Sequence, residues 1–408
     1  MSYEIMEIDI AHPPETLQLS EEAMGIAILL RQCGNPVGFW METLASNPAL
    51  GAEILARKLR NRIAQGNFGI NARPKDHGES KHYQAPSLSI AICTRDRPQL
   101  AIACVRSVSN QFSSAAVGGS FREIIVVDNA PSDDRTRCAL EAFPDVHYVH
   151  EPKAGLNFAR NRAIAVARGD LIAYVDDDVV IDSGWLRGLL NAVSDNPDAG
   201  AFTGQILPLE LVTEAQILFE LRGGFRRGFA RVRYDSNWRG GVLYPCRAGM
   251  FGNGANMAFR RDVLERLGGF DEALDTGPEL PGGGDMDIFY RVVRAGYPLV
   301  YDPQYLVFHR HRRDMTGLRT QYQDSWGKAA MAYAEKCLRT DSGNRPKIIL
   351  FIFWWFLHEL WQIQKSIRGR HAIPATILLS ELKGGIAGIF GEYGRSRERV
   401  QRIRQKHA

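Results

Sequence analysis

Three adjacent carboxylates, Asp176, Asp177 and Asp178, are the residues of this sequence whose type and spacing most suggest chemistry. Each negative charge makes its neighbours harder to ionise, so three acids in a row are costly unless a cation offsets them. Divalent ions such as Mg²⁺ and Mn²⁺ bind carboxylate oxygen and would remove that cost. The alternative is an acidic surface turn, because acidic triplets are common on protein surfaces.

The residues around the triplet favour the metal site. Residues 171–175 are apolar and partly β-branched or aromatic, which is typical of a strand buried on both faces. Val179 and Val180 continue the apolar pattern after the acids. Open α/β sheets bind their ligands at the carboxyl ends of strands, which is where this pattern puts the three carboxylates.

Strand and helix patterns alternate from residue 88 onward. Strand-like stretches at 88–93, 123–127, 146–149 and 171–175 are separated by helical stretches and polar turns. This alternation predicts an α/β fold with a mostly parallel sheet flanked by helices. No G-x-G-x-x-G follows the first strand and no G-x-x-x-x-G-K occurs, which argues against a dinucleotide-binding domain and a P-loop NTPase.

Composition sets broad limits on the kind of protein. The chain has 408 residues, of which 45% are hydrophobic and 24% charged, as expected for a globular protein of two or three domains. A net charge of +4 is small for this length and does not indicate a nucleic acid partner. The six cysteines show no C-x-x-C spacing, which predicts reduced thiols in the cytosol, and the acidic N-terminus does not look like a signal peptide.

Several motifs between residues 87 and 315 resemble those of the family 2 glycosyltransferases, in that family's order. They are T-R-D-R-P (94–98), V-V-D-N-A (126–130), L-N-F-A-R-N-R-A (156–163), G-D-L-I-A-Y-V-D-D-D (169–178), G-G-F-D-E (268–272) and G-G-G-D-M-D-I-F-Y-R-V (282–292). The resemblance implies the GT-A fold, a nucleotide-binding α/β sheet with a metal-binding Asp motif. It also implies an inverting, metal-dependent transfer of a sugar to an acceptor hydroxyl in glycan, polysaccharide or glycolipid assembly. A nucleotide-diphosphate sugar is the implied donor, most often a UDP-sugar.

The resemblance assigns nucleotide contacts to residues at the ends of the first strands. These residues are Thr94, Asp96, Asp128, Arg160 and Asp176. A helix cap or Asx turn is the alternative for Asp128, because an Asp before a turn often has that role. A solvated position in the first turn of a helix is the alternative for Arg160.

The resemblance also implies a metal centre. Asp176 and Asp178 match the family's metal-binding pair, and His309 matches the imidazole that completes the site in related enzymes. The expected cofactor is Mn²⁺ or Mg²⁺, which would act as a Lewis acid on the departing diphosphate. The three arginines within residues 310–313 could offset diphosphate charge.

Asp285 resembles the family's general base, which takes the proton of the acceptor hydroxyl. The family usually has Glu-Asp where this chain has Gly284-Asp285, so the first of two adjacent carboxylates is missing, and Glu279 is an acid that could compensate. A helix cap is the alternative for Asp285. The sugar-site residues that the resemblance assigns are Gly254, Asn256 and Asp287.

Two extensions flank this domain of residues 86–315. Residues 1–85 are expected to form a helical accessory region, with helices at 21–30 and 48–65 and a polar linker at 71–86. Residues 316–408 are expected to form a helical, membrane-associating region.

The C-terminal region carries an apolar run of ten residues, 348–357, which is too short to span a bilayer. Three tryptophans within residues 354–361 fit a helix that lies in the membrane interface. Residues 365–408 contain ten Lys or Arg and three Glu, a charge that favours anionic lipid. We expect a cytoplasmic protein on the inner face of the cell membrane, acting on a sugar or lipid-linked acceptor. A core helix or a homodimer contact is the alternative for the apolar run.

Two other functions compete with glycosyl transfer. A nucleotidyltransferase on a similar sheet would carry a glycine- and lysine-rich phosphate loop after the first strand, and T-R-D-R-P is not such a loop. A non-catalytic nucleotide-sugar-binding or scaffold protein is supported only by the missing Glu at Gly284.

Overall fold

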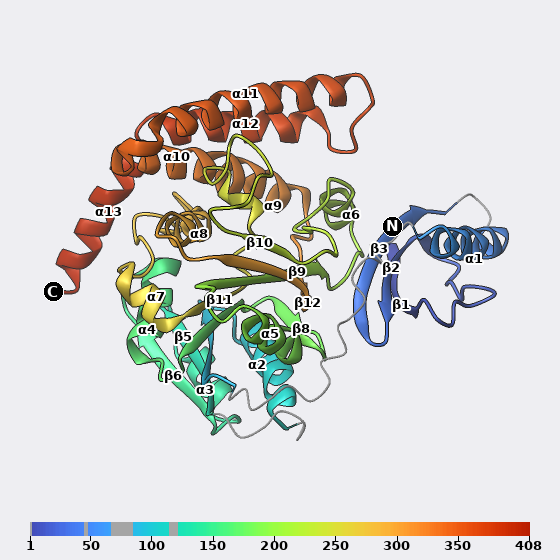
Figure 1. Ribbon diagram of the computed structural model, residues 1–408, viewed down its shortest axis with the longest axis horizontal. Coiled ribbons are helices and arrows are strands. Elements are labelled where there is room, and N and C mark those ends of the chain that lie inside the picture. Colours follow the sequence, from blue (N-terminus) through green and yellow to red (C-terminus); the bar gives the residue numbers. More distant parts are fainter. Residues whose placement is uncertain (1, 45–47, 67–84, 114–120) are drawn as a thin grey trace.

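The computed structural model describes residues 2–44, 48–66, 85–113 and 121–408. A large sheet with helices around it forms the centre of the molecule, as Figure 1 shows. A small N-terminal unit lies at one side of this sheet, and a layer of C-terminal helices lies along another.

The strands of the large sheet run mainly in one direction. Those that share this direction are β4 (Leu88–Thr94), β5 (Arg122–Asn129), β6 (Val146–Glu151), β7 (Leu171–Asp176), β9 (Ala201–Pro208) and β12 (Leu299–His309). The opposite strands are β8 (Val179–Ile181), β10 (Val232–Tyr234) and β11 (Asn256–Arg260). Among the described residues the sheet has nine strands in the order β10-β12-β9-β11-β7-β4-β5-β6, with β8 paired to β12. The predicted α/β class and mostly parallel sheet are confirmed.

Helices cover both faces of the sheet because its central strands are apolar on both sides. In β4, Ile90 and Ile92 belong to the core on one face, whereas Ala91 belongs to the core on the other. The helices and short 3-10 turn of this domain are α2 (Pro98–Ser113), α3 (Arg135–Leu140), α4 (Leu156–Val166), α5 (Trp185–Asp195), α6 (Glu214–Leu221), η1 (Ala248–Met250), α7 (Arg261–Arg266) and α8 (Gly284–Arg294).

The N-terminal unit consists of β1 (Ser2–Asp9), β2 (Ala23–Gln32), β3 (Asn35–Thr43) and α1 (Pro48–Ala64). The helix predicted for residues 48–65 is confirmed, but the helix predicted for 21–30 is wrong. Residues 26–30 are buried on both faces of β2, and such a short apolar run fits a helix as well as a strand. The predicted linker at 71–86 falls almost entirely outside the described residues.

A two-residue hairpin explains why this segment is a strand. Cys33 and Gly34 connect β2 to β3 with φ angles of 49° and 77°, as a type I′ turn requires. The unit is tied to the large domain by Arg31, whose guanidinium pairs with the buried carboxylate of Asp182. Tyr3 also forms a β-bridge with Leu211.

The C-terminal region is helical, as predicted. Its elements are α9 (Met315–Thr320), the π-helix η2 (Gln321–Lys328), α10 (Ala329–Thr340), the 3-10 turn η3 (Ser342–Asn344), α11 (Arg345–Ile367), α12 (Ala375–Ile389) and α13 (Glu392–Lys406). Helices α11 and α12 lie side by side along one edge of the molecule (Figure 1). Gly384 lets α12 approach η2 closely, because a Cβ there would lie 1.7 Å from the carbonyl oxygen of Gln323. Within the described ranges, no helix is both long enough and apolar enough to cross a bilayer.

Candidate active site

A cavity of about 770 Å³ lies at the carboxyl ends of β4 and β7 and extends to the inner side of α11. Its acidic lining residues near the strand ends are Asp176, Asp177, Asp178, Asp275 and Asp285. Its basic lining residues are Arg97, Arg160, Arg222, Arg227, Arg247, His309, Arg312 and His358. Charged groups of both signs therefore face one cavity, as expected of a site that binds an anionic ligand through a cation.

Sheet register brings the predicted metal ligands together. Strand β8 pairs with β12 so that Val179 lies opposite His309, and the N–H of Arg310 donates to the carbonyl of Asp178. One ligand atom from each of Asp176, Asp178 and His309 lies within 4.8 Å of the other two. The three residues chosen from the sequence thus form one cluster.

The middle acid of the triplet has a different role. Asp177 accepts hydrogen bonds from the hydroxyl of Thr94 at 2.7 Å and from Arg97 at 3.1 Å. Because the protein already satisfies Asp177, this residue fixes the turn that presents its two neighbours. Thr94 does not line the cavity and acts through this contact.

The cluster fits a divalent cation. Oδ1 of Asp178 is buried and has no hydrogen-bond partner among the described residues, although Nε2 of His309 lies 3.2 Å away. An uncompensated buried carboxylate oxygen is costly, and a metal ion would compensate it. Two carboxylates and one imidazole are suitable donors for Mn²⁺ and acceptable ones for Mg²⁺.

A chain of buried side chains orients His309. Nε2 of His311 lies 2.8 Å from Oε1 of Glu220, and the Nδ1 atoms of the two histidines are 3.0 Å apart. If Glu220 accepts from His311, the neutral His311 can only accept at Nδ1, so His309 donates there. Burial opposes the protonation of His309, but the charge of Asp178 outweighs it and raises the pKa of His309. A metal that binds Nε2 of His309 would therefore displace a proton from this atom.

Charge crowding shifts the pKa values of the three acids. Burial, followed by the charge of Asp178, raises the pKa of Asp176 to about 6. Burial and Asp178 also raise the pKa of Asp177. Burial opposes the ionisation of Asp178 as well, but His309 and Arg97 outweigh it and hold the pKa of Asp178 well below its usual range. One acid is thus held ionised while its neighbours resist ionisation.

Asp285 lies in the first turn of α8 and faces the cavity. Its Oδ2 accepts from the N–H of Gly254 at 2.9 Å, and its Oδ1 accepts from the N–H of Met286 at 2.8 Å. The N-cap position belongs to Gly283, so Asp285 is not the residue that caps the helix. Glu279 is exposed and does not line the cavity, so it does not compensate for the acid missing at Gly284.

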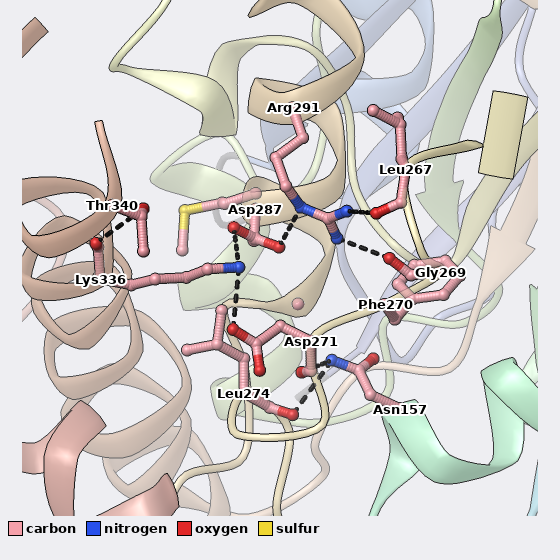
Figure 2. A network of polar contacts seen from close by, with 12 residues as sticks. Asn157, Leu267, Gly269, Phe270, Asp271, Leu274, Asp287, Arg291, Lys336 and Thr340 are labelled. Atoms are coloured by element: carbon pink, nitrogen blue, oxygen red, sulfur yellow. Dashed lines mark hydrogen bonds and ion pairs between the residues drawn. The ribbon is translucent and has the colours of Figure 1, made fainter. Parts of the chain in front are cut away.

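Two residues expected at the sugar site lie in buried polar networks. Asn256 is fully buried, and its amide bonds the carbonyls of Gln205 and Tyr305 and the indole of Trp185. Asp287 is also buried and pairs with Arg291 at 2.8 Å and Lys336 at 2.5 Å (Figure 2). Neither residue lines the cavity, because both serve the packing of their own elements.

The expected nucleotide contacts are spread over the same sheet edge. Asp128 is fully buried; its Oδ2 accepts from the hydroxyl of Tyr148, and its Oδ1 has no partner among the described residues. Asp96 accepts from the N–H and hydroxyl of Ser132 and does not line the cavity. Arg160 does line it, buried and paired with Asp275 at 3.2 Å.

The arginines that follow His309 do not act together. Arg312 lines the cavity and makes no hydrogen bond or ion pair within the described part of the chain. Arg313 pairs with Glu210 at 2.7 Å, and Arg310 lies 3.9 Å from the same carboxylate. Only Arg312 is therefore available to a ligand of the cavity.

Sequence analysis assigned no role to a buried charge cluster at the far end of the cavity. Arg222 pairs with Glu381 of α12 at 2.7 Å and lies 3.8 Å from Glu359 of α11. Glu359, which interrupts the apolar sequence after residue 357, could have indicated this cluster, because a charged residue inside such a run needs a buried partner.

Most of the large domain is similar to known proteins. Residues 89–268 match the model of the family "Glycosyl transferase family 2". A pre-mycofactocin glycosyltransferase of Mycobacterium tuberculosis is 27% identical over 214 residues, which cover 50% of this chain and 42% of that protein. A glucosyl-dolichyl phosphate glucuronosyltransferase of Haloferax volcanii is 28% identical over 195 residues, covering 46% and 58% respectively.

The chain spans about half the length of these curated relatives. Among solved structures, a mannosyltransferase from Pyrobaculum calidifontis in complex with GDP-Man and Mn²⁺ matches with a TM-score of 0.48 and 17% sequence identity. That match covers 78% of this chain and 91% of the other.

The buried acid of α11 predicts how stability depends on pH. Burial and the charge of Glu381 raise the pKa of Glu359 from 4.5 to about 8. Such a carboxyl makes its full contribution to stability at a pH below its pKa in the unfolded chain. This contribution is lost as the pH rises through its pKa in the folded protein. Glu359→Gln has no such loss, so its Tm relative to the wild type should increase by about 2 °C or more between about pH 5 and pH 9.

Thermal unfolding followed by circular dichroism would measure this difference. Glu279→Gln removes an exposed acid and is the matched control, with a Tm difference that should not change with pH. A Tm difference for Glu359→Gln that is equally independent of pH would contradict the assignment of a neutral Glu359.

Proposed function

Because residues 89–268 match the model of glycosyl transferase family 2, we propose that this chain transfers a sugar from a nucleotide-diphosphate donor to an acceptor hydroxyl. The observation that carries this proposal is the set of residues that line one cavity. The cavity holds a cluster able to bind a metal, an unpaired Arg312 and a carboxylate, Asp285, on its other side. A nucleotidyltransferase or a scaffold protein would not require the carboxylate on the acceptor side.

Asp285 is the proposed general base. It removes the proton from the acceptor hydroxyl while the acceptor oxygen forms a bond to the anomeric carbon of the donor. The bond between that carbon and the diphosphate oxygen breaks, and the nucleoside diphosphate leaves with the electron pair. Attack from the side opposite the leaving group inverts the configuration of the anomeric carbon.

Asp176, Asp178 and His309 would hold Mn²⁺ or Mg²⁺. When bound, the ion would act as a Lewis acid that offsets negative charge on the diphosphate. Arg312 would add a second positive charge to the same region, since no carboxylate of the described chain pairs with it. Asp128 does not line the cavity, but its buried Oδ1 has no partner among the described residues and is the atom proposed to accept a hydrogen bond from the ribose or base. A UDP-sugar is the proposed donor.

The far end of the cavity suggests the kind of acceptor. Phe351, Trp354 and Trp355 of α11 line the cavity, which gives an aromatic wall beyond the polar site. We therefore propose an acceptor that carries an apolar group, such as a lipid-linked sugar. Aromatic walls also bind sugar rings, so an unlinked sugar acceptor is the alternative.

Helix α11 is also the proposed membrane contact. Its exposed apolar side chains recur at helical spacing, at Ile349, Leu350, Phe353, Leu357, Leu360, Trp361 and Ile367. Leu379, Ile386 and Phe390 extend this apolar face onto α12 and its C-terminal end. Because the inner side of α11 packs in the core, the helix would lie flat on a cytoplasmic membrane surface. A homodimer through this face is the alternative.

Substitution of a metal ligand tests the proposed cofactor. Mn²⁺ with UDP or GDP should raise the Tm of the wild-type protein more than the nucleotide with EDTA does, since a ligand of the native state stabilises it. Asp178→Asn should lose the metal-dependent part of this shift. Asp170→Asn, at the opposite end of the same strand, is the control. Equal stabilisation of the wild type in EDTA would remove the metal from the proposal.

Substitution of the base tests the proposed reaction. Asp285→Asn should lower kcat by about 10²–10⁴-fold, the usual contribution of general-base catalysis, while nucleotide binding is retained. The measurement is release of nucleoside diphosphate from UDP-glucose, UDP-galactose, UDP-N-acetylglucosamine and GDP-mannose, with a panel of octyl glycosides as acceptors. Glu279→Gln should turn over normally. Near-normal turnover by Asp285→Asn would return Asp285 to a structural role.

The membrane contact is best tested by point substitution. Truncation before α11 would also remove Trp355 from the core and leave Arg222 without its carboxylate partners. Phe353 and Leu357 are 65% and 66% exposed, so replacing both with Glu should leave the fold intact and abolish binding to vesicles that contain anionic lipid. Met24→Glu, on the N-terminal sheet, is the control. Unchanged vesicle binding, or loss of a dimer in light scattering, would contradict the membrane assignment.

A further inference from the structure

The space beside Gly284 is already occupied. A Cβ at Gly284 would lie 2.3 Å from Oδ2 of Asp275 and 2.3 Å from Nδ2 of Asn157, so no side chain fits there without displacing them. The N–H of Gly284 donates to the same Oδ2 at 3.0 Å. The carboxylate of Asp275 thus lies where the side chain of a residue at 284 would begin.

The backbone of Asp275 is held in an unusual conformation to achieve this. Its φ of 55° lies in the left-handed region, which non-glycine residues rarely adopt. Its N–H donates to the carbonyl of Gly282 at 3.2 Å, and its carbonyl accepts from Leu156 at 2.9 Å. A strained residue that is fixed on both sides is typical of a functional position.

A network of polar contacts holds the loop that carries Asp275, as Figure 2 shows. Asn157 of α4 donates to the carbonyls of Asp271 and Leu274. Lys336 of α10 lies between the carboxylates of Asp271 and Asp287, at 2.8 Å and 2.5 Å. The same contacts therefore connect the loop, the helix that carries Asp285, and the C-terminal helices.

Asp275 reaches the cavity from this loop. Its residue is only 8% exposed, yet it lines the cavity together with Asp285. Oδ2 is used by Gly284 and Arg160, while Oδ1 makes no hydrogen bond within the described part of the chain. Gly254 lies beside Asp285 and Arg160: its N–H donates to Asp285, and a Cβ there would lie 2.7 Å from the Arg160 guanidinium that pairs with Asp275. Burial raises the pKa of Asp275 to about 6, against the opposing charge of Arg160.

We propose that Asp275 supplies the second carboxylate of the acceptor site, from a loop rather than from position 284, and that it binds a hydroxyl next to the one that Asp285 deprotonates. The ligand class is a sugar or polyol with neighbouring hydroxyl groups. This inference rests on the proposed function, since it requires an acceptor in the cavity. The alternative is that Asp275 has only a structural role, in which it holds Arg160 and the start of α8.

Asp275→Asn tests the inference, because Asn keeps the shape and can still accept from Gly284. A hydrogen bond to a charged group contributes about 1.5–3 kcal/mol, so kcat/KM for the octyl glycosides should fall about 10–100-fold. Hydrolysis of the donor in the absence of acceptor should stay within about 2-fold, as should nucleotide binding. Octyl glycosides that lack the neighbouring hydroxyl should react equally with the variant and the wild type.

Asp287→Asn is the matched control for a structural effect. It breaks the buried pair with Lys336, so it should lower the Tm while leaving the ratio of transfer to hydrolysis unchanged. If Asp275→Asn lowers transfer and hydrolysis equally, or neither, Asp275 has only a structural role and the inference is overturned. If the wild type cleaves no donor in the panel, the proposed function itself fails, which is a distinct result.

Discussion

The crowding of carboxylates in one buried cavity is the physical constraint that governs this structure. Asp176, Asp177 and Asp178 follow one another in sequence, and Asp275 and Asp285 face the same space from a loop and a helix. Left alone, such a set of like charges would destabilise the fold, because burial and mutual repulsion both oppose ionisation. Paired arginines, an oriented histidine and the proposed cation offset that cost. The fold around the cavity must therefore supply the partners that stabilise these charges.

The fold meets this constraint by drawing partners from distant segments. Pairing of β8 with β12 sets His309 beside Asp178, and a buried Glu220 beyond His311 sets the orientation of the imidazole. Arg160 of α4 reaches Asp275, and Lys336 of α10 ties the loop to α8. The C-terminal helices consequently belong to the site as much as the sheet does, even though the family match ends at residue 268.

Sequence patterns predicted the parts that depend on local rules. An apolar strand followed by acids predicted a cation site at the end of that strand, and the resemblance to family 2 glycosyltransferases added His309 to it; the structure brings these residues together. Patterns failed where tertiary contacts decide. The apolar run of β2 fits two secondary structures, Asn256 and Asp287 serve buried networks, and the position of Asp275 depends on a left-handed residue and on the close approach of Gly284. The spacing of residues in the sequence cannot predict those tertiary contacts.

Helix α11 has two apolar faces, one packed in the core and one exposed. Its inner face contributes Phe351 and Trp355 to the core and to the cavity wall, so the helix cannot detach from the domain without opening the site. Its outer face exposes large apolar side chains, which is more typical of a contact surface than of a solvated one. Glu359 sits on the inner side and pairs through Arg222 with α12, which fixes the rotation of the helix about its axis. The proposed lipid-linked acceptor would therefore meet the proposed membrane-binding surface and an aromatic cavity wall on the same helix.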